Sequence, residues 1–264
     1  MRLYEELAKT GLEDLKMMTA LETLDTASQE AAAGGWSYTH FLGYLLDGEL
    51  KARHRLRVKM SLQFARFPYL KRIEDFDYGA QPAVDRRLIE ELHTLRFVDE
   101  GRNIIFLGPP GVGKTHLAIG LGVALAEEGR RVYFTTAIDL ATRLSKALHE
   151  NRLPRIMKNL TRPKLLIIDE VGYLKLDKVQ ASLLFQVISG RYELESATVI
   201  TSNKAFGEWG DVFAEDAVMA SAALDRLLHR STVLKINGDS YRMMEKKKAG
   251  VKLANEESKK APKG

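Results

Sequence analysis

The residues with the most specific chemistry lie at positions 108–115, where the sequence reads Gly-Pro-Pro-Gly-Val-Gly-Lys-Thr. This is the complete G-x-x-x-x-G-K-[ST] spacing, with an apolar run before it and a helical pattern after it. Glycines at these positions let backbone N–H groups turn onto phosphate oxygens, and the start of the following helix adds positive charge. Lys114 is then placed to neutralise β- and γ-phosphate charge, and the Thr115 hydroxyl to ligate Mg²⁺. The predicted nucleotide-binding residues are Gly108, Pro109, Pro110, Gly111, Val112, Gly113, Lys114, Thr115 and His116.

Two adjacent carboxylates follow another apolar run. Residues 165–168 read Leu-Leu-Ile-Ile, and Asp169 and Glu170 come directly after them. By itself such a pair is often a solvated strand end, but together with the phosphate-binding loop it is typical of a hydrolytic site. Asp169 would hold Mg²⁺ through water, and Glu170 would orient and deprotonate the attacking water. The two segments together predict hydrolysis of a nucleoside triphosphate.

Apolar runs of strand length alternate with segments of helical length over the C-terminal two thirds of the chain. Continuous apolar strands that alternate with helices are typical of a parallel sheet covered on both faces. We therefore predict an α/β fold with helices on both faces of a parallel sheet. The runs cover residues 103–107, 131–135, 165–168, 197–201 and 231–236.

The N-terminal part has a purely helical pattern. Leucines recur at helical intervals over residues 3–32, and Gly34-Gly35 ends this run. A second helix is predicted from near Ser37 or Thr39 until shortly before Pro68. Residues 73–82 are rich in turn formers and are expected to form a linker.

These patterns predict three parts of the chain. We expect a small all-helical domain at residues 1–75 that takes part in DNA binding and assembly. A nucleotide-binding α/β domain is expected at 76–250. The Lys-rich segment 251–264 is expected to be a disordered tail.

Basic residues are concentrated in three segments of a chain whose net charge is only +5. Residues 51–72 hold eight Lys or Arg and no Asp or Glu, residues 137–164 hold seven basic and two acidic residues, and residues 242–264 hold eight and three. Such local excesses are typical of surfaces that meet phosphates. In the second predicted helix, cations flank an apolar stripe and are expected to contact DNA; they are Lys51, Arg53, Arg55, Arg57 and Lys59.

The composition also bears on the compartment. The chain has no cysteine, so it has neither a disulfide framework nor a thiolate metal site. The N-terminus lacks the apolar region of a signal peptide, and no stretch approaches the roughly 20 apolar residues of a membrane span. We expect a cytoplasmic protein without a membrane partner.

Taken together, the motifs resemble AAA+ ATPases of the initiator and helicase-loader clade, the DnaA and DnaC type, and within it the IstB family of insertion-sequence ATPases. The similar stretches span about residues 36–250. The phosphate-binding loop is common to many enzymes, whereas GKTHLA together with IIDE-x-GYL and SYR is much more specific. The stretches are Trp36-Ser-Tyr, Ala65-Arg-Phe-Pro, GPPGVGKTHLA, LLIIDEVGYL, TSN, LDRLLHR and GDSYR.

The resemblance implies roles for polar residues that are ambiguous by themselves. Asn203, just after the fourth apolar run, matches the residue that senses the γ-phosphate. Arg226 matches the arginine finger that completes a neighbouring subunit's site, although Arg230 lies only one helical turn away. Arg242 matches a second arginine that acts within its own subunit. Residues 137–160 match a region that faces DNA in this clade, and the expected contacts there are Arg143, Lys146 and Arg152.

The resemblance further implies ATP and Mg²⁺ as cofactors, DNA-stimulated hydrolysis and a homo-oligomer whose active sites are shared between subunits. The family binds duplex DNA with little sequence preference, bends it and delivers it to a partner transposase. A DnaC-like replicative helicase loader is the first alternative, and a P-loop kinase of small molecules is the second. The basic, aromatic-poor helix at 51–59 favours duplex over single-stranded DNA.

Overall fold

The structure is a computed structural model that describes residues 2–173, 175–241 and 243. Backbone packing divides the chain into two units, one that ends at Met60 and one that begins at Ser61. The domain boundary predicted at 75/76 lies later in the chain, and the domain limits stay a prediction. The predicted second arginine, Arg242, and the tail at 251–264 lie outside the described residues.

The first unit is entirely helical, with a small core. Its helices are α1 (Arg2–Asp14), α2 (Met18–Gly34) and the part of α3 (Tyr38–Ala65) up to Met60. Ala20, Ala27 and Leu45 form its buried core. The Ser37 hydroxyl accepts a hydrogen bond from the backbone N–H of His40 at the start of α3, as expected for a helix N-cap.

Residues 3–32 do not form the single helix that their leucine spacing predicts. Helix α1 ends at Asp14 and α2 begins at Met18, and Lys16 between them has a left-handed backbone with φ of 55°. Side chains on α3 stabilise this turn. The carboxylate of the buried Glu49 accepts hydrogen bonds from the N–H groups of Thr19 and Ala20, and so caps α2 in place of a local side chain.

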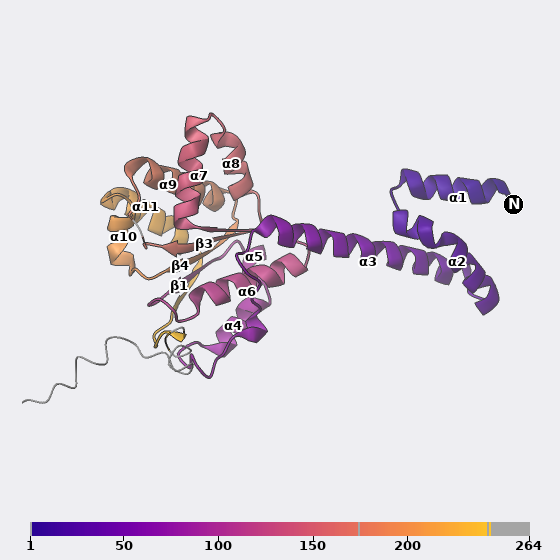
Figure 1. Ribbon diagram of the computed structural model, residues 1–264, viewed down its shortest axis with the longest axis horizontal. Coiled ribbons are helices and arrows are strands. Elements are labelled where there is room, and N and C mark those ends of the chain that lie inside the picture. Colours follow the sequence, from indigo (N-terminus) through magenta and orange to yellow (C-terminus); the bar gives the residue numbers. More distant parts are fainter. Residues whose placement is uncertain (1, 174, 242, 244–264) are drawn as a thin grey trace, which may run out of the picture. The chain divides into compact units, whose positions relative to one another are not determined.

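The second unit contains a five-stranded sheet in which all paired strands are parallel (Figure 1). The strand order is β2-β3-β4-β1-β5. The five predicted apolar runs all form strands; β1 to β4 are almost entirely buried, whereas most of β5 is half-buried or exposed. Their bounds are β1 (Asn103–Leu107), β2 (Val132–Thr136), β3 (Leu165–Val171), β4 (Ala197–Ser202) and β5 (Ser231–Lys235).

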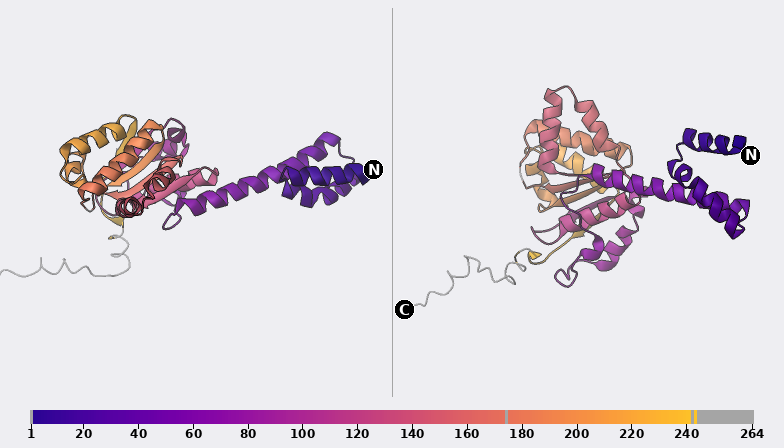
Figure 2. Two further views of the ribbon diagram at one scale, coloured as in Figure 1. Left: turned by 90° about the horizontal axis from the view of Figure 1, so that it is seen from above. Right: turned by 45° about the vertical axis from the view of Figure 1, so that its right-hand side comes forward.

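Helices cover both faces of this sheet, as the sequence predicts (Figures 1 and 2). Successive strand residues alternate between the two hydrophobic cores: Ile104 and Phe106 lie in one, and Ile105 in the other. The first core is covered by α4 (Arg86–His93), α5 (Arg96–Asp99) and α6 (Lys114–Glu127). The second is covered by α7 (Ala137–His149), α8 (Leu153–Thr161), α9 (Lys178–Glu193), α10 (Trp209–Val212) and α11 (Ala217–Leu228).

The segment expected to be a linker is partly built into the first core. It contains a short 3₁₀ helix, η1 (Ile73–Asp75), and a second one, η2 (Phe206–Glu208), precedes α10. Ile73 and Phe76 are buried against α6. The turn-forming residues in this segment suggested a linker, but its two large apolar side chains, Ile73 and Phe76, pack into the core. No helix in the described parts of the chain combines the length and the apolar character needed to cross a membrane.

Candidate active site

The phosphate-binding loop lies between β1 and α6, at the carboxyl end of the sheet. Gly113 has φ of 95°, and a Cβ atom there would lie 2.5 Å from the ring of Phe76. Gly108 has φ of 154°, and a Cβ atom there would lie 2.1 Å from the carbonyl oxygen of Ile236. Only glycine satisfies both the backbone angle and the space at these two positions. The fully buried Val112 packs in the core and anchors the loop.

Lys114 and Thr115 begin α6, so their side chains stand at the positive end of that helix. The Lys114 ammonium donates hydrogen bonds to the carbonyl oxygens of Gly108 and Pro109, each at 2.7 Å. These contacts hold the charge against the loop, where phosphate oxygens are expected. The ring nitrogen Nε2 of the neighbouring His116 is 2.8 Å from the carbonyl oxygen of Arg72.

Asp169 is buried beside Thr115, as a metal site would require. The Thr115 hydroxyl lies 3.0 and 3.1 Å from the two carboxylate oxygens of Asp169. Burial raises the pKa of Asp169, whereas hydrogen bonds from Thr201 and Thr115 and the charge of Lys114 lower it. A hydroxyl and a desolvated carboxylate form an oxygen donor set that suits Mg²⁺, because a cation offsets the cost of the buried negative charge.

Glu170 is held in a strained backbone conformation by β4. Its φ is 61°, in the left-handed region that non-glycine residues rarely adopt. The pairing of β3 with β4 shifts here, since Ile168 faces Ile200 but Val171 faces Ser202. This bulge turns Glu170 out of the ladder, and its side chain lines the cavity next to the phosphate-binding loop.

Thr201 connects the two carboxylate residues. Its hydroxyl donates to Asp169 and accepts a hydrogen bond of 3.0 Å from the backbone N–H of Glu170. Thr201 is 1% exposed, so solvent cannot replace either bond. The sequence-based prediction chose Asn203 two positions later; Asn203 is exposed and lines neither cavity beside the loop. No local signal in the sequence marks Thr201, because its contact with Asp169 depends on the shifted pairing of β3 with β4.

A cavity of about 340 Å³ extends from the loop toward the segment before α4. Of the predicted nucleotide-binding residues, Gly111, Gly113, Lys114, Thr115 and His116 line it. The cavity is also lined by aromatic and polar groups that the sequence analysis assigned to a linker or to no function. These are Tyr69, Lys71, Asp75, Phe76, Asp77, Gln81, Tyr173 and Tyr241.

Comparisons with known proteins show the family of this chain. The family described as IstB-like ATP binding protein matches residues 10–249. An ATP-binding protein of insertion sequence IS21 from Pseudomonas aeruginosa is 45% identical over 92% of this chain and 91% of its own length. An ATP-binding protein of insertion sequence IS5376 from Geobacillus stearothermophilus is 44% identical over 88% and 92%. The chain belongs to the IstB-like ATP-binding proteins.

Solved structures show the fold of this IstB-like protein. DnaI is similar with a TM-score of 0.53 and 20% identity, over 67% of this chain and 92% of that one. AMPPCP-bound DnaA from Aquifex aeolicus has a TM-score of 0.52 and 21% identity, over 70% and 57%. The α/β unit therefore has the predicted AAA+ fold, which it shares with DnaA and DnaI.

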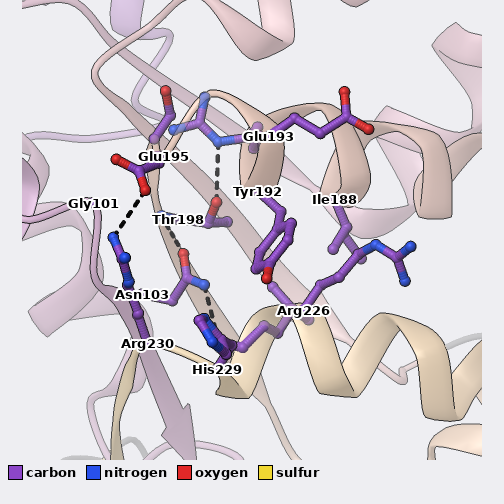
Figure 3. Close-up of a pocket in the computed structure, with 13 residues that line it drawn as sticks. Gly101, Asn103, Ile188, Tyr192, Glu193, Glu195, Thr198, Arg226, His229 and Arg230 are labelled. Carbon is purple, nitrogen blue, oxygen red and sulfur yellow. Dashed lines mark hydrogen bonds and ion pairs between the residues drawn. The ribbon is translucent and has the colours of Figure 1, made fainter.

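The two candidate arginine fingers of the IstB-like chain lie at a different cavity, of about 260 Å³ (Figure 3). Arg226 is half-buried over the ring of Phe185, 4.9 Å from its centroid, and donates to the carbonyl of Ala222. Arg230 forms an ion pair of 3.1 Å with Glu195. Figure 3 shows the two side chains extending in different directions. Among the described residues, Arg226 has no carboxylate partner, which favours it over Arg230 as the finger.

Arg191 lies in the wall of the same cavity and has a structural role. It is 1% exposed, and burial lowers its pKa to about 9. Its guanidinium donates to Thr198 and to the carbonyls of Leu160, Pro163 and Ala197. It therefore ties the end of α8 to the starts of β3 and β4.

The predicted DNA-binding residues differ in whether their side chains already have partners within the protein. Arg53 bonds the Glu49 carboxylate at 2.7 Å and the carbonyls of Leu15 and Lys16. Lys51 pairs with Asp47, and Arg152 with Glu150. The exposed side chains without such a partner among the described residues are Arg55, Arg57, Lys59 and Lys146, whereas Arg143 is half-buried.

Proposed function

We propose that this IstB-like protein hydrolyses ATP with Mg²⁺, assembles on duplex DNA, and delivers that DNA to a partner transposase. The observation that carries the hydrolysis is the Thr201-centred arrangement of Asp169 and Glu170 next to the phosphate-binding loop. In this proposal Thr115 and Asp169 hold the metal, which would neutralise phosphate charge when bound. Lys114 contacts the β- and γ-phosphates.

Glu170 acts on the attacking water in this scheme. Its strained backbone and its place in the cavity support a role as the general base, because strain of this kind is kept where a side chain must be aimed. Phosphoryl transfer needs chiefly positioning and charge stabilisation. The buried, hydrogen-bonded Asp169 would hold a metal ion that could supply the charge stabilisation. Asn203 as γ-phosphate sensor and Arg242 as second arginine stay predictions.

The position of Arg226 supports a shared active site. The cavity of Arg226 contains Asn103, the first residue of β1, whereas the phosphate-binding loop follows the last residue of that strand. At about 3.3 Å per residue, the two ends of β1 are separated by roughly 15 Å. We therefore infer that Arg226 serves the site of a second copy, so that activity requires an oligomer.

DNA binding is supported by the exposed cations of α3 and α7 and by the origin of the relatives in insertion sequences. Bending a short duplex costs several kcal/mol, and backbone contacts from several subunits would offset it. A helicase loader of DnaC type is the second candidate, because it shares the AAA+ core. If the protein were a small-molecule kinase, Arg226 would have no catalytic role at its separate cavity.

Mixing two inactive variants tests the shared site. Arg226→Ala should bind ATP but not hydrolyse it, and Lys114→Ala should not bind it. A mixture should regain part of the turnover, because some interfaces then join an intact loop to an intact arginine. Arg230→Ala serves as the matched control and should keep its turnover. Absence of rescue at every ratio, in mixtures shown to co-assemble, would exclude a site shared through Arg226.

A further inference from the structure

A second cavity, of about 490 Å³, opens beside the catalytic carboxylates. Its walls come from the segment after α3, the carboxyl end of β2 and the first half of α7. It shares Tyr69, Thr115 and Glu170 with the nucleotide cavity. The two cavities therefore meet at the residues proposed to act on the metal and on the attacking water.

Two arginines converge on one buried tyrosine at this cavity. The guanidinium carbon of Arg143 lies 5.5 Å from the ring centroid of Tyr133, and that of Arg66 lies 5.8 Å from it. Arg143 also donates to the Tyr133 hydroxyl. Tyr133 is 2% exposed and packs edge-on against Phe64, so it is a fixed platform. Both cations therefore lie beside the same ring, and Arg66 is close enough for its charge to act on Arg143.

Neither arginine forms an ion pair among the described residues, although Asp139, Asp169 and Glu170 line the same cavity. The described partners of Arg66 and Arg143 are the ring and hydroxyl of Tyr133. Burial, and then the charge of Arg66, lowers the pKa of Arg143. Each guanidinium carries five N–H donors, most of which find no acceptor here. Like charges that converge in this way are stabilised by an anion between them.

The start of α7 adds to the positive potential at this cavity. Thr136 is its N-cap, and the helix continues for 13 residues. The N–H groups of a first helical turn favour a bound anion. Asp139 lines the same cavity, but it is exposed and forms no ion pair with Arg143, which lies one turn further along α7.

We propose that Arg66 and Arg143 form a binding site for a phosphate group next to the catalytic carboxylates. Phosphate is favoured over a carboxylate because its tetrahedral oxygens can accept from two guanidinium forks at once. Asp169 and Glu170 repel an anion, so the phosphate is held at the arginine end of the cavity. The effect of this site on turnover rests on the proposed ATPase function, whereas its binding of phosphate does not.

The phosphate has two possible sources with the same chemistry. If a backbone phosphate of duplex DNA binds at this site, DNA binding could affect Glu170, which lines the same cavity. Inorganic phosphate released by ATP hydrolysis would instead bind at this site before it leaves the protein. It would then inhibit the next round of hydrolysis. The two sources are separated by measuring DNA affinity and free phosphate binding on the same variants.

The test uses Arg66→Gln and Arg143→Gln, with Lys178→Gln as the control, because Lys178 is exposed and lines neither cavity. Inorganic phosphate is titrated calorimetrically onto protein saturated with a non-hydrolysable ATP analogue, which keeps phosphate out of the nucleotide site. Lys114→Ala is titrated without nucleotide as well, so that binding is measured even if the ATPase proposal fails. Arg66 is exposed, and Arg66→Gln is therefore expected to stay folded.

We expect wild type and Lys178→Gln to bind phosphate alike and each arginine variant to bind it about tenfold more weakly, which corresponds to one lost charge-assisted hydrogen bond. If DNA supplies the phosphate, each arginine variant also lowers the slope of log affinity against log salt by about 0.9 relative to Lys178→Gln. If the released product supplies it, that slope is unchanged and phosphate inhibits turnover less. Unchanged phosphate binding together with an unchanged salt slope in folded Arg66→Gln overturns the proposal.

Discussion

Replacing Thr201 by valine removes the hydroxyl that links Asp169 to Glu170 while keeping nearly the same shape. Wild-type Thr201 donates to the Asp169 carboxylate at 2.5 Å and accepts from the Glu170 N–H at 3.0 Å. Valine can do neither. Thr201 is 1% exposed and Asp169 is 4% exposed, so solvent replaces the lost partner poorly.

The magnitude follows from the two bonds. A hydrogen bond to a charged group contributes about 1.5–3 kcal/mol, and a buried N–H left without an acceptor costs about 1–3 kcal/mol. If about 2 kcal/mol of this is lost from the transition state, turnover falls roughly 30-fold. ATP affinity should change less than about threefold, because the loop and Lys114 are expected to contact the phosphates directly, whereas Thr201, in the same cavity, contacts Asp169 and Glu170. Thr201→Ser keeps the hydroxyl and should retain turnover within about threefold of wild type.

The assay is steady-state ATP turnover over a series of Mg²⁺ concentrations, together with nucleotide binding measured by a fluorescent ATP analogue. Thr201→Val should need more Mg²⁺ for half-maximal turnover, because Asp169 is no longer oriented. Circular dichroism establishes that the variant is folded. Turnover and Mg²⁺ dependence like those of wild type, in a folded Thr201→Val that binds ATP, would refute the assigned role of Thr201.

Three further predictions address catalysis, stability and DNA. Glu170→Gln should bind ATP and DNA but hydrolyse ATP at least about 100-fold more slowly, since the general base is gone; unchanged turnover in a single-turnover assay would exclude Glu170. Arg191→Met should lower the free energy of unfolding by about 3–5 kcal/mol in urea titrations, because four buried acceptors lose their donor; Arg191→Lys should restore part of this, and a loss below about 1 kcal/mol would contradict the structural role. Replacing Arg55, Arg57 and Lys59 together by alanine should flatten the salt slope of DNA binding by about 2–3, whereas Lys51→Ala, which removes a cation already paired with Asp47, should change it less; equal slopes for all these proteins would move the DNA surface away from α3.

The parts of the fold that depend on local sequence were predictable. The strands are short apolar runs, and the loop at 108–115 follows from glycine spacing that has few other uses. The all-parallel sheet then follows from the alternation with helices. The contact of Thr201 with Asp169 could not be predicted, because it depends on the one-residue shift between β3 and β4.

The sequence also did not reveal which side chains from distant segments contact one another. Arg53 looks like one more cation in a basic helix, yet it bonds carbonyls at the turn between α1 and α2. That turn depends on the left-handed backbone of Lys16, which the leucine spacing does not reveal. Likewise, Arg66 and Arg143 are far apart in the sequence and meet only because both pack on Tyr133.

The most direct test of the account is the rate of ATP hydrolysis by the wild-type protein with and without duplex DNA of unrelated sequences, with Lys114→Ala measured in parallel. We predict Mg²⁺-dependent turnover that duplex DNA accelerates alike for each sequence and that Lys114→Ala abolishes. Turnover that is the same with and without duplex DNA, or that persists in Lys114→Ala, would contradict it.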